Sequence, residues 1–186
     1  RELRWIEIPV RSGEPTRAAL KPRTQTEAKP RSLSATHGLD AQPLHTDGAH
    51  LSRPPDLVAL VAEEVNSTST RLWTMRGPAQ TCVPWPALLH GVFMVNSGHD
   101  RFLATCRAGG RIRYDPGCMT PCDQRARAAV RFFDEAIEQA DHHHWDRPNT
   151  VLLIDNRASL HARGAVSEAD GSSRTLHRVA FTLGAA

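Results

Sequence analysis

The chain has 186 residues, enough for one domain but too few for two full domains. Hydrophobic residues make up 40% and charged residues 23%, which excludes a wholly disordered chain and a fibre. The net charge of +3 is spread along the chain without a basic stripe, so we expect no nucleic-acid partner. No apolar run approaches the roughly 20 residues that span a bilayer, and acids interrupt the N-terminal stretch where a signal peptide is apolar. We therefore expect a cytoplasmic protein without a membrane partner.

The first part of the chain predicts two strands separated by a long polar segment. Residues 2–10 alternate apolar and polar side chains, which is typical of a strand. Residues 11–40 are rich in Arg, Pro, Thr and Ser and too poor in apolar residues for a core, so they predict a flexible loop or lid. Residues 56–65 form an apolar run that ends at the polar cluster Asn66–Thr70, and they predict a buried strand.

The middle of the chain predicts a hairpin and one clear helix. Residues 100–114 predict two strands around a turn at residues 108–110. Asp123 is a good N-terminal cap for a helix over residues 123–140. Apolar residues recur there at three- and four-residue steps and form one stripe for core packing. These residues are Ala126, Val130, Phe133, Ile137 and Ala140.

The C-terminal part predicts strands again. A turn at Pro148-Asn149 leads into the apolar strand Val151–Ile154, and a further strand covers Leu176–Leu183. Strands dominate the chain, with one good helix between them. The sequence therefore predicts a mainly β (α+β) fold of the barrel or sandwich type.

The cysteines and a histidine run form one candidate metal site. Cys106, Cys118 and Cys122, together with the histidines 142–144, provide enough ligands for zinc. The spacing Cys118-x-x-x-Cys122 is wider than in most structural zinc sites, however. We expect reduced, incidental thiols, as in most cytoplasmic proteins, and a solvated histidine loop. A zinc-dependent interaction module is the alternative.

A second candidate site begins at the motif His45-x-Asp47. On a strand, residues two apart face the same side, so this imidazole and this carboxylate converge. They supply two-thirds of a 2-His-1-carboxylate facial triad, the ligand set of non-haem Fe(II) oxygenases. Taken alone, the motif also fits a His–Asp hydrogen bond in a turn.

The C-terminal residues complete this second pattern. An apolar strand over residues 151–154 leads towards His161, and Arg174 follows thirteen positions later, with Arg178 after it. That interval allows a turn and a return on a neighbouring strand. His161 can then bind a metal while Arg174 holds a dicarboxylate that chelates the same metal, because a guanidinium fork suits a carboxylate.

With these residues in this order, the sequence resembles the taurine dioxygenase and clavaminate synthase group of Fe(II)/2-oxoglutarate-dependent dioxygenases. The resemblance spans residues 43–181, about three-quarters of the chain. It implies a double-stranded β-helix (jelly-roll) core with one packing helix near 123–140. It also implies a single dioxygenase domain over residues 1–186, with lid segments at 11–40 and 76–120. The matching residues are Pro43–Asp47, Pro54-Pro55, Leu57–Leu60, Leu153–Arg157, Leu160–Arg163, Arg174 and Arg178.

The resemblance implies roles for individual residues. Arg174 is expected to pair with the distal carboxylate of 2-oxoglutarate. Thr70 is expected to touch the same carboxylate, with Thr68 as a rival, although Ser and Thr replace the glycines usual there. The expected iron ligands are His45, Asp47 and His161.

The resemblance also suggests substrate contacts. Arg178 is expected either near the substrate or in a salt bridge under the barrel mouth. Arg113, Gln42 and His50 are further candidates for the substrate pocket, whereas Arg163 is expected to be structural.

The implied reaction consumes 2-oxoglutarate and O2 on Fe(II), releases succinate and CO2, and hydroxylates an unactivated C–H bond. Arg178 and Arg113 favour an amino acid or another small anionic or zwitterionic metabolite as substrate. Asp47 disfavours halogenation, because related halogenases carry a small residue in its place. Desaturation, epimerisation or ring closure with the same cofactors, and a non-catalytic jelly-roll binding protein, are the alternatives. The sequence leaves the oligomeric state open.

Overall fold

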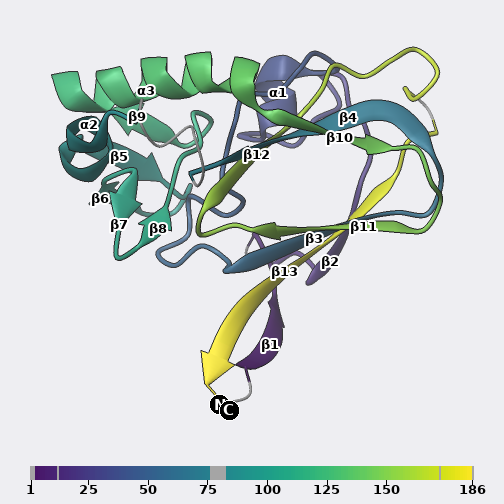
Figure 1. Cartoon of the computed structure of the whole chain (residues 1–186), viewed down its shortest axis with the longest axis horizontal. Coiled ribbons are helices and arrows are strands. Elements are labelled where there is room, and N and C mark those ends of the chain that lie inside the picture. The colour runs from purple at the N-terminus through teal and green to yellow at the C-terminus, as the bar shows by residue number, and fades with distance from the viewer. Residues whose placement is uncertain (1–2, 12, 76–82, 172, 186) are drawn as a thin grey trace.

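Two facing antiparallel sheets form the body of the computed structural model, which describes residues 3–11, 13–75, 83–171 and 173–185 (Figure 1). The larger sheet has the order β1 (Leu3–Ile8), β13 (Leu176–Ala185), β3 (Leu57–Ala62) and β11 (Thr150–Asp155), and β2 (Arg17–Leu20) pairs with the start of β13. The smaller sheet has the order β10 (Asp141–Trp145), β4 (Asn66–Thr74) and β12 (Ser159–Arg163). The prediction of a mainly β fold is confirmed.

Apolar side chains fill the space between the two sheets. Successive residues of a strand point to opposite faces, so every second residue of β3 points inward. Val58, Leu60 and Ala62 are these residues, and all three are buried. Trp145 of β10 and Leu176 of β13 meet them from the two sheets. Full burial of one such aliphatic side chain contributes about 1.5–3 kcal/mol, so this strand is an anchor of the fold.

A second core lies on the outer face of the smaller sheet, beneath α3 (Gln124–Ala136) (Figure 1). Asp123 caps this helix and accepts a hydrogen bond of 2.7 Å from the Ala126 amide. The ring of Trp73 in β4 meets Phe132 and Phe133 edge-on, with centroids 5.6 and 6.0 Å apart. The predicted helix over 123–140 is confirmed, with its end in a 3-10 turn (η2, Ile137–Gln139).

Short elements surround this second core. The predicted hairpin is confirmed where β7 and β8 meet at Gly109 and Gly110, whose φ angles of 54° and 76° suit glycine. The strand predicted before this turn is split into β6 and β7. β6 pairs with β5, and only β7 pairs with β8. The elements are α2 (Trp85–His90), β5 (Phe93–Asn96), β6 (Arg101–Ala104), β7 (Arg107–Ala108), β8 (Arg111–Ile112) and β9 (Met119–Pro121).

Two predictions of irregular structure are wrong in part. The predicted loop 11–40 contains the short elements β2 and α1 (Leu33–His37), and the histidines 142–144 lie in the strand β10. The polar cluster Asn66–Thr70, where the predicted strand ends, begins the strand β4. In each strand the backbone pairs with a neighbour that lies far away in the sequence. Such pairing outweighs a polar local composition. Residues 76–82 of the second predicted lid lie outside the described part of the chain.

Within the described residues, no helix is long and apolar enough to cross a membrane.

Candidate metal centre

Among the described residues, His45, Asp47 and His161 form the one group of metal-ligating side chains close enough to share an ion. Nε2 of each histidine lies 3.9 Å from Oδ1 of Asp47, and the ligand atoms all lie within 4.8 Å of one another. Asp47 and His161 are each 6% exposed. Two imidazoles and one carboxylate leave coordination positions for further ligands, as in the facial triad of non-haem iron enzymes.

Backbone pairing brings the first and last of these residues together. The amide of His45 donates to the carbonyl of His161 at 2.9 Å, and the reverse bond measures 3.0 Å. On its other side, the Thr46 amide donates to the Tyr114 carbonyl at 2.6 Å. His45 lies on this isolated bridge and Asp47 begins a turn, so the two converge without the regular strand expected from the sequence.

Asn156 fixes the backbone of Asp47. Its Oδ1 accepts a hydrogen bond of 3.0 Å from the Asp47 amide, and its Nδ2 donates to the carbonyls of Asp47 and Pro55 at 3.0 Å each. Asn156 is 1% exposed, so water cannot replace these bonds. The sequence places Asn156 within the matched region, but it gives no sign of this contact.

Replacing Asn156 by alanine is expected to weaken metal binding by about 10- to 100-fold, the usual effect of losing a residue that orients a ligand. The substitution also leaves the buried Asp47 amide without a partner, at a cost of about 1–3 kcal/mol. Anaerobic Co(II) titration measures the affinity, and thermal unfolding measures the stability. The exposed Asn96→Ala is the matched control. Wild-type metal affinity in Asn156→Ala would contradict the positioning role.

The electrostatics of the site suit a divalent cation. Burial, and then the neighbouring His45, lower the pKa of His161 to about 3, so its imidazole is neutral at physiological pH. Burial alone would raise the pKa of Asp47, but Arg178, His161 and His45 outweigh it and hold that pKa below its ordinary value. The site therefore offers a neutral imidazole at His161 and an ionised carboxylate at Asp47. His45 is also oriented by its Nδ1, which lies 3.1 Å from the Pro43 carbonyl.

Arg174 is a buried cation that makes no ion pair among the described residues, although the charge of Asp170 raises its pKa. Its Nε donates to Oδ1 of Asn66 at 3.0 Å, and it makes no ion pair there. The Asp170 carboxylate instead accepts hydrogen bonds from the amides and hydroxyls of Ser67 and Thr68. Burial, and then the nearby Arg163, lower the pKa of Arg174 to about 10. A buried guanidinium in this state favours an anionic ligand.

Thr70 and its rival Thr68 differ in what their hydroxyls do. The Thr68 hydroxyl donates to Asp170 at 2.6 Å and is thus already used. The Thr70 hydroxyl accepts a bond of 3.1 Å from Nε1 of Trp145, which leaves its own proton for another acceptor. The structure therefore favours Thr70 as the residue available to a ligand.

The candidate substrate contacts lie in different places. Arg178 donates to both Asp47 oxygens at 3.5 Å and faces the space between the sheets. His50 bonds to the Val10 backbone, and burial, followed by the charge of Arg11, lowers its pKa.

The guanidinium of Arg113 is occupied by backbone carbonyls. It donates to Ala49, Leu51 and Ser52, and so holds the loop that follows the metal motif. Gln42 donates to Ser34 of α1 at 3.1 Å. For both residues, a substrate contact stays a prediction.

The alternative zinc site is wrong. Cys106, Cys118 and Cys122 are free, and they do not gather with the histidines 142–144 into a metal-binding group of described residues. The predicted solvated loop is also wrong, because these histidines alternate along β10. His143 lies towards the inside, whereas His142 and His144 are exposed.

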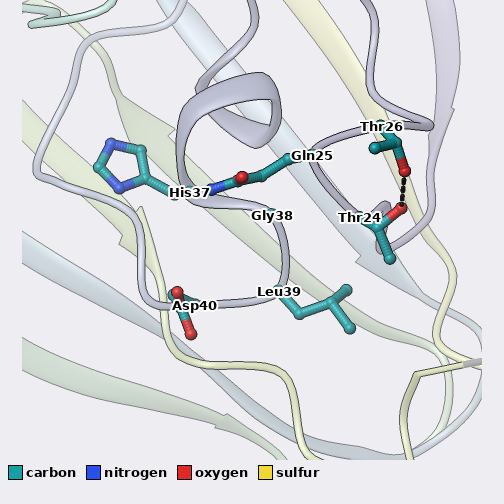
Figure 2. Close-up of a pocket in the computed structure, with 7 residues that line it drawn as sticks. All are labelled: Thr24, Gln25, Thr26, His37, Gly38, Leu39 and Asp40. Atoms are coloured by element: carbon teal, nitrogen blue, oxygen red, sulfur yellow. Dashed lines mark hydrogen bonds between the residues drawn. The ribbon is translucent and has the colours of Figure 1, made fainter.

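Two surface pockets lie away from the triad. The larger has a volume of about 700 Å³ and lies between the loop after Ser52 and the strands β6–β8. The smaller, of about 310 Å³, lies within the predicted lid segment 11–40 (Figure 2). Its lining residues are Thr24, Gln25, Thr26, His37, Gly38, Leu39 and Asp40. No triad residue lines either pocket.

No family model and no curated protein matches the sequence. Comparison with solved structures shows that the chain has the fold of the non-haem iron oxygenases. Asparagine oxygenase matches with a TM-score of 0.66 and 23% identity, over 78% of this chain and 50% of that chain. The non-haem iron oxygenase OrfP in complex with Fe and alpha-ketoglutaric acid matches with a TM-score of 0.67 and 19% identity, over 90% of this chain and 56% of that chain. The chain thus spans only about half the length of these proteins.

Proposed function

We propose that this chain is a single Fe(II)- and 2-oxoglutarate-dependent oxygenase domain with a double-stranded β-helix core. Such a core has two facing layers of four strands each. The larger sheet provides β1, β13, β3 and β11, with β2 beside β1 at one edge. The smaller sheet provides β10, β4 and β12, and the His45 bridge lies at its edge. The observation that carries the proposal is the His45, Asp47 and His161 triad, with the buried Arg174 held by Asn66 of β4, the strand that pairs with the β12 strand of His161.

The triad residues are the proposed iron ligands. Their donor set, two imidazoles and one carboxylate, suits Fe(II) and leaves positions for a chelating co-substrate and O2. When bound, iron with 2-oxoglutarate and O2 would supply oxidative decarboxylation to succinate and CO2 and an oxidant for a C–H bond. The chain contributes the orientation of the ligands and the exclusion of water.

The inner face of the smaller sheet is the proposed 2-oxoglutarate site. Directly opposite residues in an antiparallel pair share a face, so Leu72 and His161 form one inward row, and Thr70 and Arg163 form the next. Rows two residues apart are separated by about 6.5–7 Å. That distance suits a five-carbon dicarboxylate with one end at the metal and the other at Thr70 and Arg174.

An amino acid is the proposed substrate. A zwitterion requires positively and negatively charged partners, and both occur beside the triad. Arg178 donates to Asp47, and its positive charge also lowers the pKa of Glu14. Burial alone would raise the pKa of Glu14, but Lys29, Arg11 and Arg178 outweigh it and keep the carboxylate ionised. The asparagine oxygenase neighbour was solved with hydroxyasparagine, and OrfP with hydroxyarginine. Hydroxylation is the proposed outcome.

The segments 11–40 and 76–120 are proposed to form lids over this site. Arg163 supports the first of them, because its guanidinium leaves the inner face and donates to the carbonyls of Gly38 and Asp40 at 2.7 Å each. Gln25 in turn donates to the Thr36 carbonyl at 2.6 Å, which ties the middle of this segment to α1.

Turnover with a panel of amino acids tests the proposal. The protein is loaded with Fe(II) anaerobically, mixed with 2-oxoglutarate and each amino acid, and exposed to O2. Succinate and a product 16 mass units heavier than its amino acid are expected in at least one reaction. If the metal-loaded protein neither binds 2-oxoglutarate nor forms succinate, the proposed function is wrong. Binding of both ligands without succinate would identify a non-catalytic binding protein instead.

A further inference from the structure

Buried polar atoms without a hydrogen-bond partner gather on the inner face of the smaller sheet. Five such atoms occur in the described part of the chain, and three of them belong to His143, His161 and Arg163. An unsatisfied buried polar group costs about 1–3 kcal/mol, so this face is suited to a bound ligand. His161 also belongs to the triad through its Nε2, and its unpaired atom is Nδ1. Arg163 also holds the backbone at Gly38 and Asp40 through its Nη2, and its unpaired atom is Nε. Among these three residues, His143 has no part in the triad or in holding that backbone.

The ring of His143 is held beside Thr70. The two residues are directly opposite in the pairing of β10 with β4, so their side chains share the inner face. The His143 ring stands edge-on against Trp145, with centroids 4.5 Å apart and planes at 86°. Trp145 in turn donates to the Thr70 hydroxyl at 3.1 Å. Nε2 of His143 is buried and unpaired, and its residue shares the face that Thr70 lines.

The same inner face of β4 and β10 continues to the residue that holds Arg174. Asn66, which accepts the hydrogen bond from Arg174, is directly opposite Trp145 in the sheet. His143, Thr70 and Arg174 are therefore linked through one continuous strip of β4 and β10. A carboxylate has about four acceptor sites, so a guanidinium and one hydroxyl leave room for another donor.

We propose that His143 is a third donor to the distal carboxylate of 2-oxoglutarate, beside Arg174 and Thr70. Its Nε2–H completes the shell around that carboxylate and makes the site select a dicarboxylate over a monocarboxylate. This inference rests on the function proposed above. It assigns a specificity-determining role to a residue that the triad and the sequence motifs do not include.

Two substitutions at His143 separate donation from packing. His143→Leu removes the donor, and the Kd of 2-oxoglutarate is expected to rise about 10- to 100-fold, as for loss of a hydrogen bond to a charged group. His143→Gln keeps an amide N–H at a similar reach, and a Kd within about threefold of the wild type is expected. Calorimetric titration of the anaerobic Mn(II)-loaded protein measures Kd without turnover. The exposed neighbour His144→Leu is the matched control and should bind as the wild type does.

A second ligand locates the contact on the co-substrate. 2-Oxopentanoate keeps the chelating end of 2-oxoglutarate but lacks the distal carboxylate, so its Kd is expected to be equal in the wild type and His143→Leu. An unchanged Kd for 2-oxoglutarate in His143→Leu would overturn the inference, as would equal losses for both ligands or equal losses in the Leu and Gln variants. A wild-type protein that binds no 2-oxoglutarate would instead overturn the proposed function.

Discussion

Asp47→Ala is expected to abolish succinate formation and to weaken metal binding by about 100- to 1,000-fold. Four-ligand zinc sites gain about 10–16 kcal/mol on binding, so one ligand contributes roughly 3–4 kcal/mol. Asp47 is the anionic member of the triad, and both Nε2 atoms lie 3.9 Å from its Oδ1. Its loss removes a ligand and also leaves Arg178 beside the cation without a negative charge between them. Co(II) titration and the succinate assay measure the two effects.

The control for this experiment is Asp146→Ala, which removes an exposed carboxylate at the end of β10. It should leave metal affinity and succinate formation at wild-type levels. Thermal unfolding of the metal-free proteins then shows whether Asp47→Ala is folded. Full metal affinity in a folded Asp47→Ala protein would exclude Asp47 as a ligand and remove the basis of the proposed iron site.

Arg174→Met is expected to raise the Kd of 2-oxoglutarate by about 150- to 4,000-fold, because breaking a buried ion pair costs about 3–5 kcal/mol. The same substitution should have a different effect on the stability of the protein without metal and without 2-oxoglutarate. Arg174 is 6% exposed and makes no ion pair among the described residues, and burial outweighs the charge of Asp170 in its pKa, so methionine removes a buried charge that is only partly compensated. The unliganded variant should therefore unfold at the same temperature as the wild type or a higher one.

Calorimetry with 2-oxoglutarate and a thermal melt without it measure these two quantities. Arg147→Met, at an exposed position, is the matched control for the change from arginine to methionine. Arg174→Lys keeps the charge without the planar fork and should fall between the wild type and Arg174→Met. Unchanged 2-oxoglutarate affinity in Arg174→Met would show that another residue holds the distal carboxylate.

Sequence patterns predicted the elements whose signals are local. The helix after Asp123 has a cap and an apolar stripe within its own residues, and β3 is an apolar run with polar neighbours. The β7–β8 turn depends on two adjacent glycines. In these places the residues that determine the structure are close together in the chain.

The failures concern elements that depend on distant partners. β2 has only four residues and lies in a segment rich in Arg, Pro and Thr, and β13 supplies its backbone hydrogen bonds. β10 contains three histidines in a row, yet its pairing with β4 makes it a strand. No local pattern contains this information, because the pairing strand is remote in the sequence.

The candidate site shows the same division. The residue types of His45, Asp47 and His161 stand out in the sequence, and the structure brings them together. Their roles as iron ligands stay a prediction. Asn156 and His143 could not have been assigned a place, because their contacts with Asp47 and Thr70 exist only once the sheets have formed.

The Asn156 clamp has a consequence for how the protein folds. It joins Asp47 to a residue 109 positions away, so the metal centre is a long-range contact that no short fragment of the chain can form. An ion that binds only the assembled centre shifts the folding equilibrium of the whole domain. At a free concentration 100 times its Kd, such an ion adds about 2.7 kcal/mol to the stability. Metal supply would then determine how much of the protein survives as folded molecules, in addition to how much of it is active.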